Sequence, residues 1–423
     1  MCSPTRSDPC WSSPRSASAP RSSPPPDSAF SVSDRSPRPP SGHDLSVVAR
    51  LADRVAVMYG GRIVEQGLTA NVLGDPRHPY TRALLDAVPA AHAKGTRLSA
   101  DTASRPGPAP APDGCPYATR CAAADDGCRK ALPERDSQGA LCWYPAQPVA
   151  VTLRVPQPAR HDGAPGEVLV EADAISKRFR APDATSYYAV REVSFRLRAG
   201  ETLGVVGESG SGKTTVARIV LGLTEPDAGA VRFDGGPWSG IPERSRRAAR
   251  HRIQAVQQDP LGSFDPRFTV ERVIGEAVAL TGPRRGRERR AAVTELLDRV
   301  GLPAALLDRR PLELSGGQRQ RVAIARALAP SPDVIVCDEP VSALDVSVQA
   351  QILDLLDDLR RDTGVALLFI SHDLGVVHHV SGRIVVMKDG RVVETGDVEE
   401  VFAHPAQEYT RELLAAVPGG ALA

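Results

Sequence analysis

The stretch GESGSGKTT, residues 207–215, decides the fold of the larger part of this 423-residue chain. The spacing of its glycines and its Lys-Thr pair matches a phosphate-binding loop, in which backbone N–H groups turn inward around phosphate oxygens. The apolar run ETLGVV before it predicts a short strand, and VARIVLGL after it predicts a helix. The residues expected to hold nucleotide phosphates, with the Thr214 hydroxyl reaching Mg²⁺, are Gly207, Gly210, Gly212, Lys213, Thr214 and Thr215.

A second apolar run, VIVCDEP at 334–340, ends in two adjacent carboxylates. This run and VALLFIS at 365–371 lack polar alternation, which is typical of strands buried on both faces of a parallel sheet. Apolar residues recur at helical spacing between them, so the order strand–helix–strand predicts an α/β fold with a mostly parallel sheet. At the carboxyl edge of that sheet we expect Asp338 to hold Mg²⁺ through water and Glu339 to act as general base on the attacking water.

The stretch LELSGGQRQRVAIARAL at 312–328 resembles the signature motif of ATP-binding cassette (ABC) ATPases. In that family the motif opens a helix whose N–H groups grip the γ-phosphate of a nucleotide bound by another domain. The resemblance implies a P-loop NTPase with a mostly parallel core, an antiparallel β subdomain and an α-helical signature subdomain, and it implies ATP and Mg²⁺ as cofactors. The signature residues assigned in this way are Ser315, Gly316, Gly317 and Gln318.

Further motifs of the ABC pattern follow in order. Gln258 in VQQDP matches the Q-loop, which touches Mg²⁺ and senses the transmembrane partner, although Gln257 stands where an aromatic is more usual. Asp345 ends the stretch SALD, which matches the D-loop, and His372 matches the switch histidine that contacts the γ-phosphate. The candidates for the aromatic that stacks on adenine are Phe179 first, then Tyr187 or Tyr188.

Longer stretches narrow the resemblance to ATP-binding subunits of oligopeptide and dipeptide importers, a group that includes nickel importers. These stretches are QQDPLGSFDPRFTV at 257–270, HPAQEYTRELLAAVP at 404–418, DPRHPYTRALLDAVP at 75–89 and GCPYATRC at 114–121. The resemblance implies ATP hydrolysis that drives import through membrane permease subunits. It also implies a second ATPase subunit, identical or different, and an extracytoplasmic solute-binding protein as partners.

Composition limits the remaining classes of function. The 52 basic and 51 acidic residues leave no net charge that favours nucleic-acid binding, and we expect no nucleic-acid partner. No run approaches the roughly 18 apolar residues that a membrane-spanning helix needs. We therefore expect a peripheral protein at the cytoplasmic face of the plasma membrane.

One part of the sequence occurs twice. Residues 43–89 (copy one) and 372–418 (copy two) align without a gap at an offset of 329, and 23 of 47 positions are identical. Copy two ends a domain that carries every motif above, whereas copy one follows no phosphate loop, signature motif or Asp-Glu pair. We interpret the chain as the tail of one importer ATPase joined to a complete second one. On this interpretation residues 1–40 stand where most of a first domain would be, as a shifted reading frame or misplaced start would leave.

The predicted organisation has five parts. They are a disordered Ser/Pro-rich start at 1–40, a truncated ABC-domain fragment at 41–90, a Cys-rich importer-type extension at 91–150, a linker at 151–166 and a complete ABC ATPase domain at 167–423.

Four cysteines cluster in the extension, at positions 115, 121, 128 and 142. Some relatives bind a [4Fe–4S] cluster with such a set, and four thiolates suit either iron–sulfur or zinc. The spacing contains no Cys-x2-Cys knuckle that would favour zinc. Three readings stay open for Cys115, Cys121, Cys128 and Cys142: an iron–sulfur cluster, a zinc ion, and packing cysteines without metal.

Three other functions also stay open. The chain could be a defective fused fragment that binds ATP without supporting transport, or an importer ATPase for nickel or another solute. It could also be a non-transport ABC protein, but that class carries two full domains with a charged linker or a domain split by a long coiled coil. Neither feature occurs in this sequence.

Overall fold

The computed structural model describes residues 29–31, 48–49, 51–89, 92–99, 111–145, 166–180, 185–283 and 285–415. Nearly all of the Ser/Pro-rich start and of the linker at 151–166 lies outside these ranges. The predictions made for those segments therefore stay predictions. His43, where copy one begins in the sequence, also lies outside the described residues.

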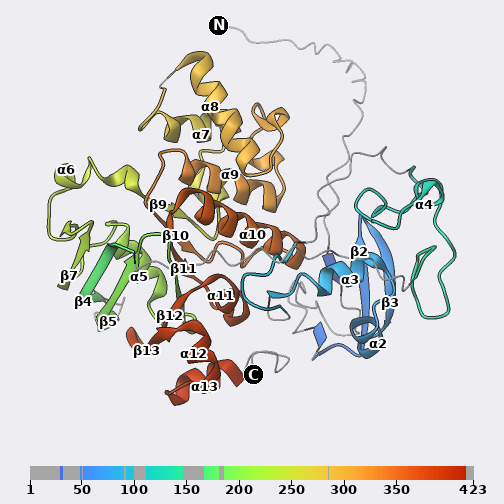
Figure 1. Cartoon of the computed structure of the whole chain (residues 1–423), viewed down its shortest axis with the longest axis horizontal. Coiled ribbons are helices and arrows are strands. Elements are labelled where there is room, and N and C mark those ends of the chain that lie inside the picture. The colour runs from blue at the N-terminus through green and yellow to red at the C-terminus, as the bar shows by residue number, and fades with distance from the viewer. Residues whose placement is uncertain are drawn as a thin grey trace, which may run out of the picture.

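A six-stranded sheet forms the centre of the larger domain (Figure 1). Neighbouring strands are parallel except for the outermost pair, β12 and β13. In spatial order the strands are β13 (Arg391–Asp397), β12 (Arg383–Lys388), β6 (Thr202–Val206), β11 (Ala366–Ile370), β10 (Val334–Asp338) and β9 (Ile253–Val256).

Alternate side chains of the central strands enter two different hydrophobic clusters. In β11, Leu367 and Phe369 belong to the cluster that contains residues of α10, whereas Leu368 and Ile370 belong to the cluster that contains residues of α5. Both faces are therefore covered, which explains why these strands lack polar alternation. The covering helices are α5 (Lys213–Val220), α10 (Val346–Thr363), α11 (Leu374–Val380), α12 (Val398–Ala403) and α13 (Glu408–Ala415).

An antiparallel sheet and a helical part complete this domain. The sheet has the order β5-β4-β7-β8, and Arg252 ties it to the central sheet by ion pairs with Asp234 (2.8 Å) and Asp333 (2.5 Å). Its strands are β4 (Val168–Arg180), β5 (Ser186–Arg198), β7 (Ala228–Phe233) and β8 (Gly236–Pro237). The helical part holds η3 (Leu261–Ser263), α7 (Val270–Val278), α8 (Gly286–Arg299), η4 (Ala304–Leu306), η5 (Pro311–Glu313) and α9 (Gly316–Leu328). Helix α6 (Glu243–Arg246) lies beside the antiparallel sheet, and η2 (Arg250–Arg252) leads into β9. The fold predicted for this domain is confirmed.

Copy one folds like copy two. Its elements β2 (Arg54–Tyr59), β3 (Arg62–Leu68) and α2 (Thr69–Gly74) have the bounds of β12, β13 and α12 at the offset of 329, and α3 (Pro79–Leu85) corresponds to α13. The two hairpins even shift register at equivalent places, before Met58 and before Met387. The repeated sequence therefore specifies the same local structure twice.

A repeated carboxylate explains how each copy turns from its hairpin into its last helix. Glu65 accepts the N–H groups of Arg77 and His78, both at 2.9 Å. Glu394, its equivalent, accepts the N–H groups of Ala406 at 2.8 Å and Gln407 at 3.2 Å. These bonds satisfy backbone donors that the turn would otherwise leave unpaired.

The neighbour of copy one's hairpin differs from that of copy two. Strand β12 pairs with β6, whereas the same edge of β2 pairs antiparallel with β1 (Ala29–Ser31). We expected disorder across 1–40, and the structure differs at these three residues. Without an equivalent of β6 among the described residues, this edge of β2 would leave backbone N–H and C=O groups unpaired. A nearby segment can pair with these groups as an added strand.

Copy one and the segment that follows it contact α10 of the larger domain. The N–H groups of Leu98 and Ser99 donate to the two carboxylate oxygens of Asp354, at 3.0 and 2.7 Å, and Arg97 pairs with Asp358 at 3.1 Å. Asp354 is only 8% exposed, so its charge needs these donors. Figure 1 shows α3 close to the end of α10.

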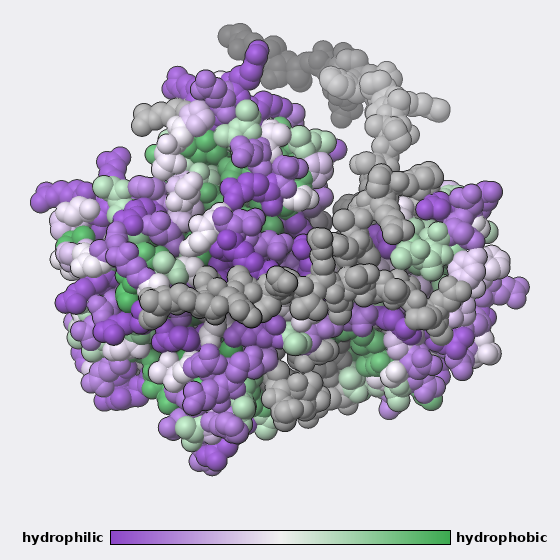
Figure 2. Space-filling view, viewed as in Figure 1, coloured by the Kyte–Doolittle hydropathy of each residue, from purple (hydrophilic) through white to green (hydrophobic). Residues whose placement is uncertain are grey.

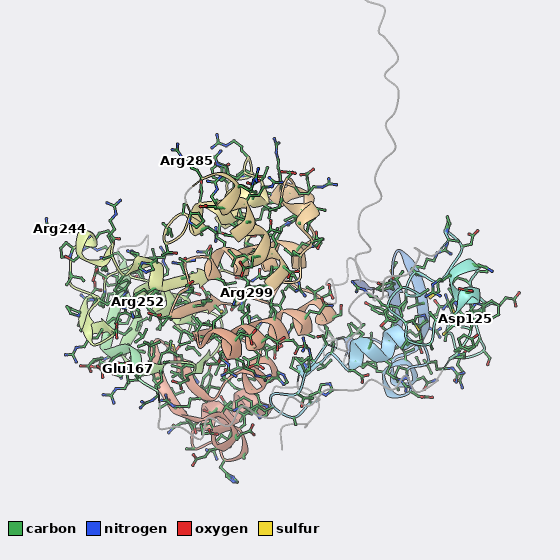
Figure 3. The ribbon with its side chains drawn as sticks, turned by 45° about the horizontal axis from the view of Figure 1, so that its top comes forward. Asp125, Glu167, Arg244, Arg252, Arg285 and Arg299 are labelled. Atoms are coloured by element: carbon green, nitrogen blue, oxygen red, sulfur yellow. The ribbon has the colours of Figure 1, made fainter. Side chains whose placement is uncertain are left out.

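The Cys-rich unit has little regular structure. Its one described helix, α4 (Asp126–Lys130), is capped by Asp125, which accepts the Cys128 N–H at 2.8 Å. The hydroxyl of Tyr144 also donates to Asp125, and this bond, with the backbone bonds, lowers the pKa of Asp125 to about 2. Figure 3 shows Asp125 at the outer edge of the unit.

Within the described residues, no helix is both long and apolar enough to cross a membrane. On the face shown in Figure 2, hydrophilic residues predominate and hydrophobic ones show only in separate small areas.

Candidate nucleotide-binding site

The loop predicted to bind phosphate lies between β6 and α5, at the carboxyl edge of the central sheet. Gly207, Gly210 and Gly212 all have positive φ, at 146°, 86° and 100°. A Cβ on Gly207 would lie 2.1 Å from the carbonyl oxygen of Met387, and one on Gly212 would lie 2.2 Å from that of Ala189. Strand β5 and the β12–β13 turn thus press on the loop so closely that glycine is required.

Lys213, the first residue of α5, turns back into the loop. Its Nζ donates to the carbonyl oxygens of Gly207 at 2.7 Å and Glu208 at 2.8 Å, and the residue is only 5% exposed. Burial lowers the pKa of Lys213, and the carboxylates of Glu339, Asp338 and Glu208 oppose that shift. The ammonium therefore lies at the centre of the loop, next to the acidic edge of β10.

Asp338 is the last residue of β10 and points at α5. The Thr214 hydroxyl donates to its Oδ1 at 3.3 Å. Burial raises the pKa of Asp338, and the Thr214 bond opposes that shift. A half-buried carboxylate beside a threonine hydroxyl is a donor set that suits Mg²⁺, and a bound cation would offset the cost of partly burying the charge.

Glu339 follows with a strained backbone. Its φ is +50°, a conformation that non-glycine residues rarely adopt, and its N–H donates to Ile370 of β11 at 2.9 Å. This conformation aims the side chain along the sheet edge, where Oε1 lies 3.2 Å from Nδ1 of His372. Two residues predicted separately, from stretches 33 positions apart, thus meet at one point.

The signature residues form the start of α9. The Ser315 hydroxyl accepts the Gln318 N–H at 3.3 Å, and the Gln318 side chain accepts the Ser315 N–H at 3.0 Å, which makes a capping box. A Cβ on Gly317 would lie 2.5 Å from Val348 of α10, whereas one on Gly316 would make only ordinary contact. Helix α9 packs with α7 and α8, and α5 packs on the sheet, so the signature and the phosphate loop belong to different parts of the molecule (Figure 1).

The Q-loop and D-loop residues lie at strand and helix ends. Gln258 is exposed two residues beyond β9, the strand that neighbours β10. Asp345 caps α10 by accepting the Val348 N–H at 3.0 Å. Asp345 therefore has a structural role as the N-cap of α10, in addition to the D-loop role that its motif implies.

The aromatic candidates lie at the ends of β4 and β5. Phe179 and Tyr187 are 38% and 54% exposed, and their ring centres are 6.3 Å apart. Tyr188 instead has the guanidinium groups of Arg178 and Arg191 over its ring, at 5.3 and 5.2 Å. Phe179 also has a cation over its ring, since the Lys177 ammonium lies 5.8 Å from the ring centre. Ala189 of β5 touches the loop at Gly212, so Tyr187 and Tyr188 lie just before a residue in contact with the loop.

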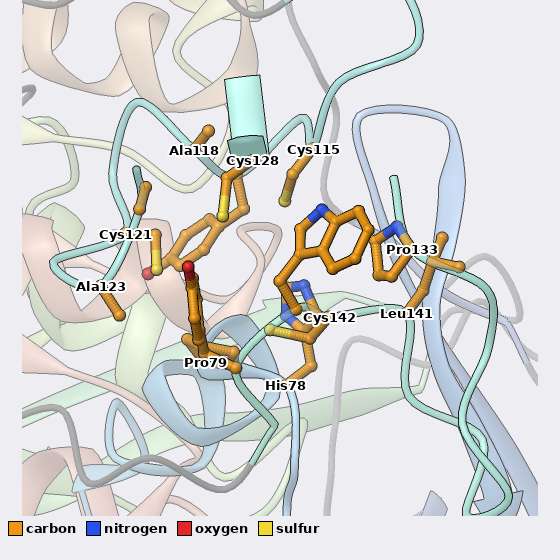
Figure 4. Close-up of a pocket in the computed structure, with 14 residues that line it drawn as sticks. His78, Pro79, Cys115, Ala118, Cys121, Ala123, Cys128, Pro133, Leu141 and Cys142 are labelled. Carbon is orange, nitrogen blue, oxygen red and sulfur yellow. The ribbon is translucent and has the colours of Figure 1, made fainter. Parts of the chain in front are cut away.

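The four clustered cysteines line one pocket, together with His78 of copy one (Figure 4). All four are free thiols, and burial raises the pKa of Cys115 and of Cys142 to about 11. The described residues nevertheless contain no group of three or more His, Cys, Asp or Glu side chains placed to hold a metal ion. The cysteines that cluster in the sequence therefore also line one pocket in space. Their thiols are not arranged to hold a metal ion in this conformation.

One contact to the loop was missed in the sequence. The N–H of Glu208 donates to the hydroxyl of Tyr409 in α13, at 3.2 Å. The repeat does mark this tyrosine, since Tyr80 occupies the equivalent position of copy one. The sequence alone, however, does not connect either tyrosine with the phosphate loop.

Two family models match the chain. The model described as "ABC transporter" matches residues 190–342, which include the loop, the signature residues and the Asp-Glu pair. The model described as "Oligopeptide/dipeptide transporter, C-terminal region" matches twice, at residues 64–128 and 393–420. The two matches of the second model fall on copy one with the Cys-rich unit and on copy two.

Curated relatives agree with these matches. The oligopeptide transport ATP-binding protein OppD of Mycobacterium tuberculosis is 43% identical over 394 residues, which cover 89% of this chain and 64% of that protein. The glutathione import ATP-binding protein GsiA of Escherichia coli (strain K12) is 41% identical over 382 residues, which cover 89% of this chain and 55% of that protein. The chain therefore spans less than two thirds of the length of these relatives.

Solved structures with a similar fold include ATP-binding cassettes. A dimer of the cassette MJ0796, in a post-hydrolysis state bound to ADP and Pi, gives a TM-score of 0.50 at 29% identity and covers 54% of this chain and 99% of that one. The protein cbiO1 of Clostridium perfringens gives the same TM-score and identity, and covers 60% of this chain and 96% of that one.

Proposed function

We propose that residues 167–423, which include the match to the ABC transporter model at 190–342, hydrolyse ATP to power the import of oligopeptides or dipeptides through membrane permease subunits. The proposal rests on the residues that meet at the carboxyl edge of the central sheet. The phosphate loop, Asp338, Glu339 and His372 meet there, and the lysine of the loop lies beside the two carboxylates.

The roles of the residues follow from their positions. The Lys213 ammonium, placed by the carbonyl oxygens of Gly207 and Glu208, contacts β- and γ-phosphate oxygens, which are strong acceptors for an ammonium. Thr214 and Asp338, with Gln258, would hold a Mg²⁺ ion, which would supply positive charge to the transferred phosphate. Glu339 takes the proton of the attacking water, and His372 orients Glu339 and contacts the γ-phosphate. Phe179 or Tyr187 stacks on adenine.

The proposed site needs a second ATPase. The signature residues cap a helix in a different part of the molecule from the phosphate loop, so they serve a nucleotide bound by a partner. We infer a head-to-tail dimer in which the capped start of α9 faces the loop of the other subunit. The relative solved as a dimer with ADP and Pi supports this arrangement.

Phosphate release by the purified full chain, with and without Mg²⁺, tests the proposal. Mg²⁺-dependent release supports an ATPase. ATP binding without any release, in the presence of co-expressed permease subunits, favours the alternative of a defective fused fragment.

A groove beside the Q-loop fits the permease. It is lined by the end of α5, by β9 and by the end of α7, and its exposed apolar residues Leu223 and Leu280 are 58% and 61% accessible. Arg247, Arg250 and His251 form its polar rim. We propose that an amphipathic helix of a permease subunit binds here at the cytoplasmic face of the membrane, since β9 leads directly to Gln258 and can transmit a pull to the Mg²⁺ site.

Replacing Leu280 by Glu should abolish co-purification with co-expressed permease subunits and leave the basal ATPase rate within about twofold, because the charge lands in an apolar contact outside the nucleotide site. Leu68 of copy one, 52% exposed, gives a matched control as Leu68→Glu. Equal retention of permease by both variants contradicts the groove assignment.

We also propose that the four clustered thiols hold a [4Fe–4S] cluster. Their number and chemistry fit, and they line one pocket, although they must move closer together and lose protons to bind iron. When bound, such a cluster cross-links the unit or exchanges an electron. The thiolates would come from Cys128 of α4 and from Cys115, Cys121 and Cys142 in the loops around it.

Protein purified without oxygen should therefore be brown and contain about four iron atoms per chain. Cys128→Ser should lose the iron, while Cys2→Ser, outside the cluster, should keep it. Colourless protein with about one zinc ion supports the zinc alternative. Metal-free protein from the same preparation contradicts both metal assignments and favours packing cysteines.

A further inference from the structure

One peptide unit of the phosphate loop is held at both ends. The carbonyl oxygen of Gly207 accepts the Lys213 ammonium at 2.7 Å. The N–H of the same unit, which belongs to Glu208, donates to the hydroxyl of Tyr409 at 3.2 Å. Tyr409 lies in α13, 201 positions after Glu208. Its hydroxyl therefore contacts the same peptide unit whose carbonyl oxygen binds Lys213.

The Tyr409 hydroxyl is itself firmly placed. The residue is 8% exposed, and the ammonium of Lys388 lies 4.3 Å from its ring centre. Helix α13 is fixed at its start, because Glu394 of β13 accepts the N–H groups of Ala406 and Gln407. The oxygen that meets the loop is therefore held by the hairpin, the lysine and the helix together.

The loop needs such a fixed point. Gly207 has φ of +146°, a conformation open to almost no other residue, and a glycine peptide can rotate at little steric cost. Rotation of the 207–208 unit would swing its carbonyl away from Lys213 and its N–H away from Tyr409. A hydrogen bond to a buried hydroxyl opposes that rotation.

We infer that Tyr409 is a positioning residue for nucleotide binding: it fixes the 207–208 peptide and thereby presents Lys213 and the loop N–H groups to phosphate. The inference rests on the proposed binding of ATP at this loop. It also gives the C-terminal helix a direct mechanical link to the nucleotide, since any displacement of α13 moves the hydroxyl that holds the loop.

Copy one has a tyrosine at the position equivalent to Tyr409. Tyr80 is equivalent to Tyr409, and its ring lies 4.6 Å from that of Tyr59, which occupies the position of Lys388. Tyr80 lies in α3, outside the phosphate loop that Tyr409 contacts. The chain thus supplies its own matched control.

The test compares Tyr409→Phe and Tyr80→Phe in the full chain, with ATP binding followed by a fluorescent ATP analogue. Phe keeps the ring and its packing and removes only the hydroxyl. Tyr409→Phe should weaken nucleotide affinity roughly three- to tenfold, the range expected for one hydrogen bond. The turnover at saturating ATP should stay within about twofold, because the catalytic carboxylate is untouched. Amide exchange at 207–210 should quicken in Tyr409→Phe alone, which a general loss of packing would not produce.

The outcomes separate the two proposals. If the wild-type chain binds no ATP, the proposed function fails and the inference fails with it. If the wild-type chain binds ATP and Tyr409→Phe binds it equally well, or if both Phe variants weaken binding alike, Tyr409 has no positioning role while the proposed function stands.

Discussion

Replacing Glu339 by Gln should lower the ATP turnover of the chain by about a hundredfold or more, the loss expected when a positioned general base is removed. ATP affinity should stay nearly unchanged. The amide keeps the size of the carboxylate and can still meet His372, whose Nδ1 lies 3.2 Å from Glu339 Oε1. It cannot take a proton from the attacking water. Since hydrolysis is the step that opens the proposed dimer, the variant should also accumulate as an ATP-bound dimer in size-exclusion chromatography.

The chain offers a control of the same chemistry. Glu399 also lies 3.2 Å from a histidine nitrogen, Nε2 of His378, but on α12 and outside the nucleotide site. Glu399→Gln makes the same change at an equivalent contact and should leave phosphate release within about twofold, because this contact lies outside the nucleotide site. Unchanged turnover in Glu339→Gln would remove the general base from the mechanism, and an equal loss in both variants would indicate a general effect of breaking such pairs.

The larger domain could be predicted well because its chemistry lies in short continuous stretches. The phosphate loop joins a strand to the next helix, and Asp338 and Glu339 end another strand, so local sequence alone places them at the carboxyl edge of a parallel sheet. The meeting of Glu339 with His372 also follows, since β10 and β11 are adjacent and in register. The positive φ of Glu339 does not follow, because no local rule requires a non-glycine residue there.

The contacts that escaped prediction join segments far apart in the chain. Leu98 donates to Asp354 across 256 positions, and Glu208 donates to Tyr409 across 201. Each uses a backbone N–H, which leaves no mark on the sequence of the donor. The strand β1 escaped for a similar reason, since its pairing with β2 depends on an open sheet edge and not on a pattern of its own.

Two variants, each inactive alone, should regain activity when mixed. Lys213→Ala removes the charge that we propose holds the β- and γ-phosphates and should lose nucleotide affinity. Gly316→Asp places a negative charge at the start of α9, facing the partner's γ-phosphate. Gly316 suits this test better than Gly317, because a Cβ there makes ordinary contact with Leu344 instead of a clash with Val348. Each variant alone should release phosphate only at background rate, since both sites of each dimer are then damaged.

In a mixture of equal amounts, half of the dimers pair one variant with the other, and one of their two sites joins an intact loop to an intact signature helix. The mixture should therefore recover about a quarter of the wild-type rate if two copies of the chain form the sandwich. Mixing Lys213→Ala with the double variant Lys213→Ala/Gly316→Asp gives the control, because no combination then contains an intact loop. Recovery in the first mixture alone places loop and signature on different molecules. A mixture that stays at background contradicts a dimer of identical chains and leaves the signature helix to be supplied by a different ATPase subunit.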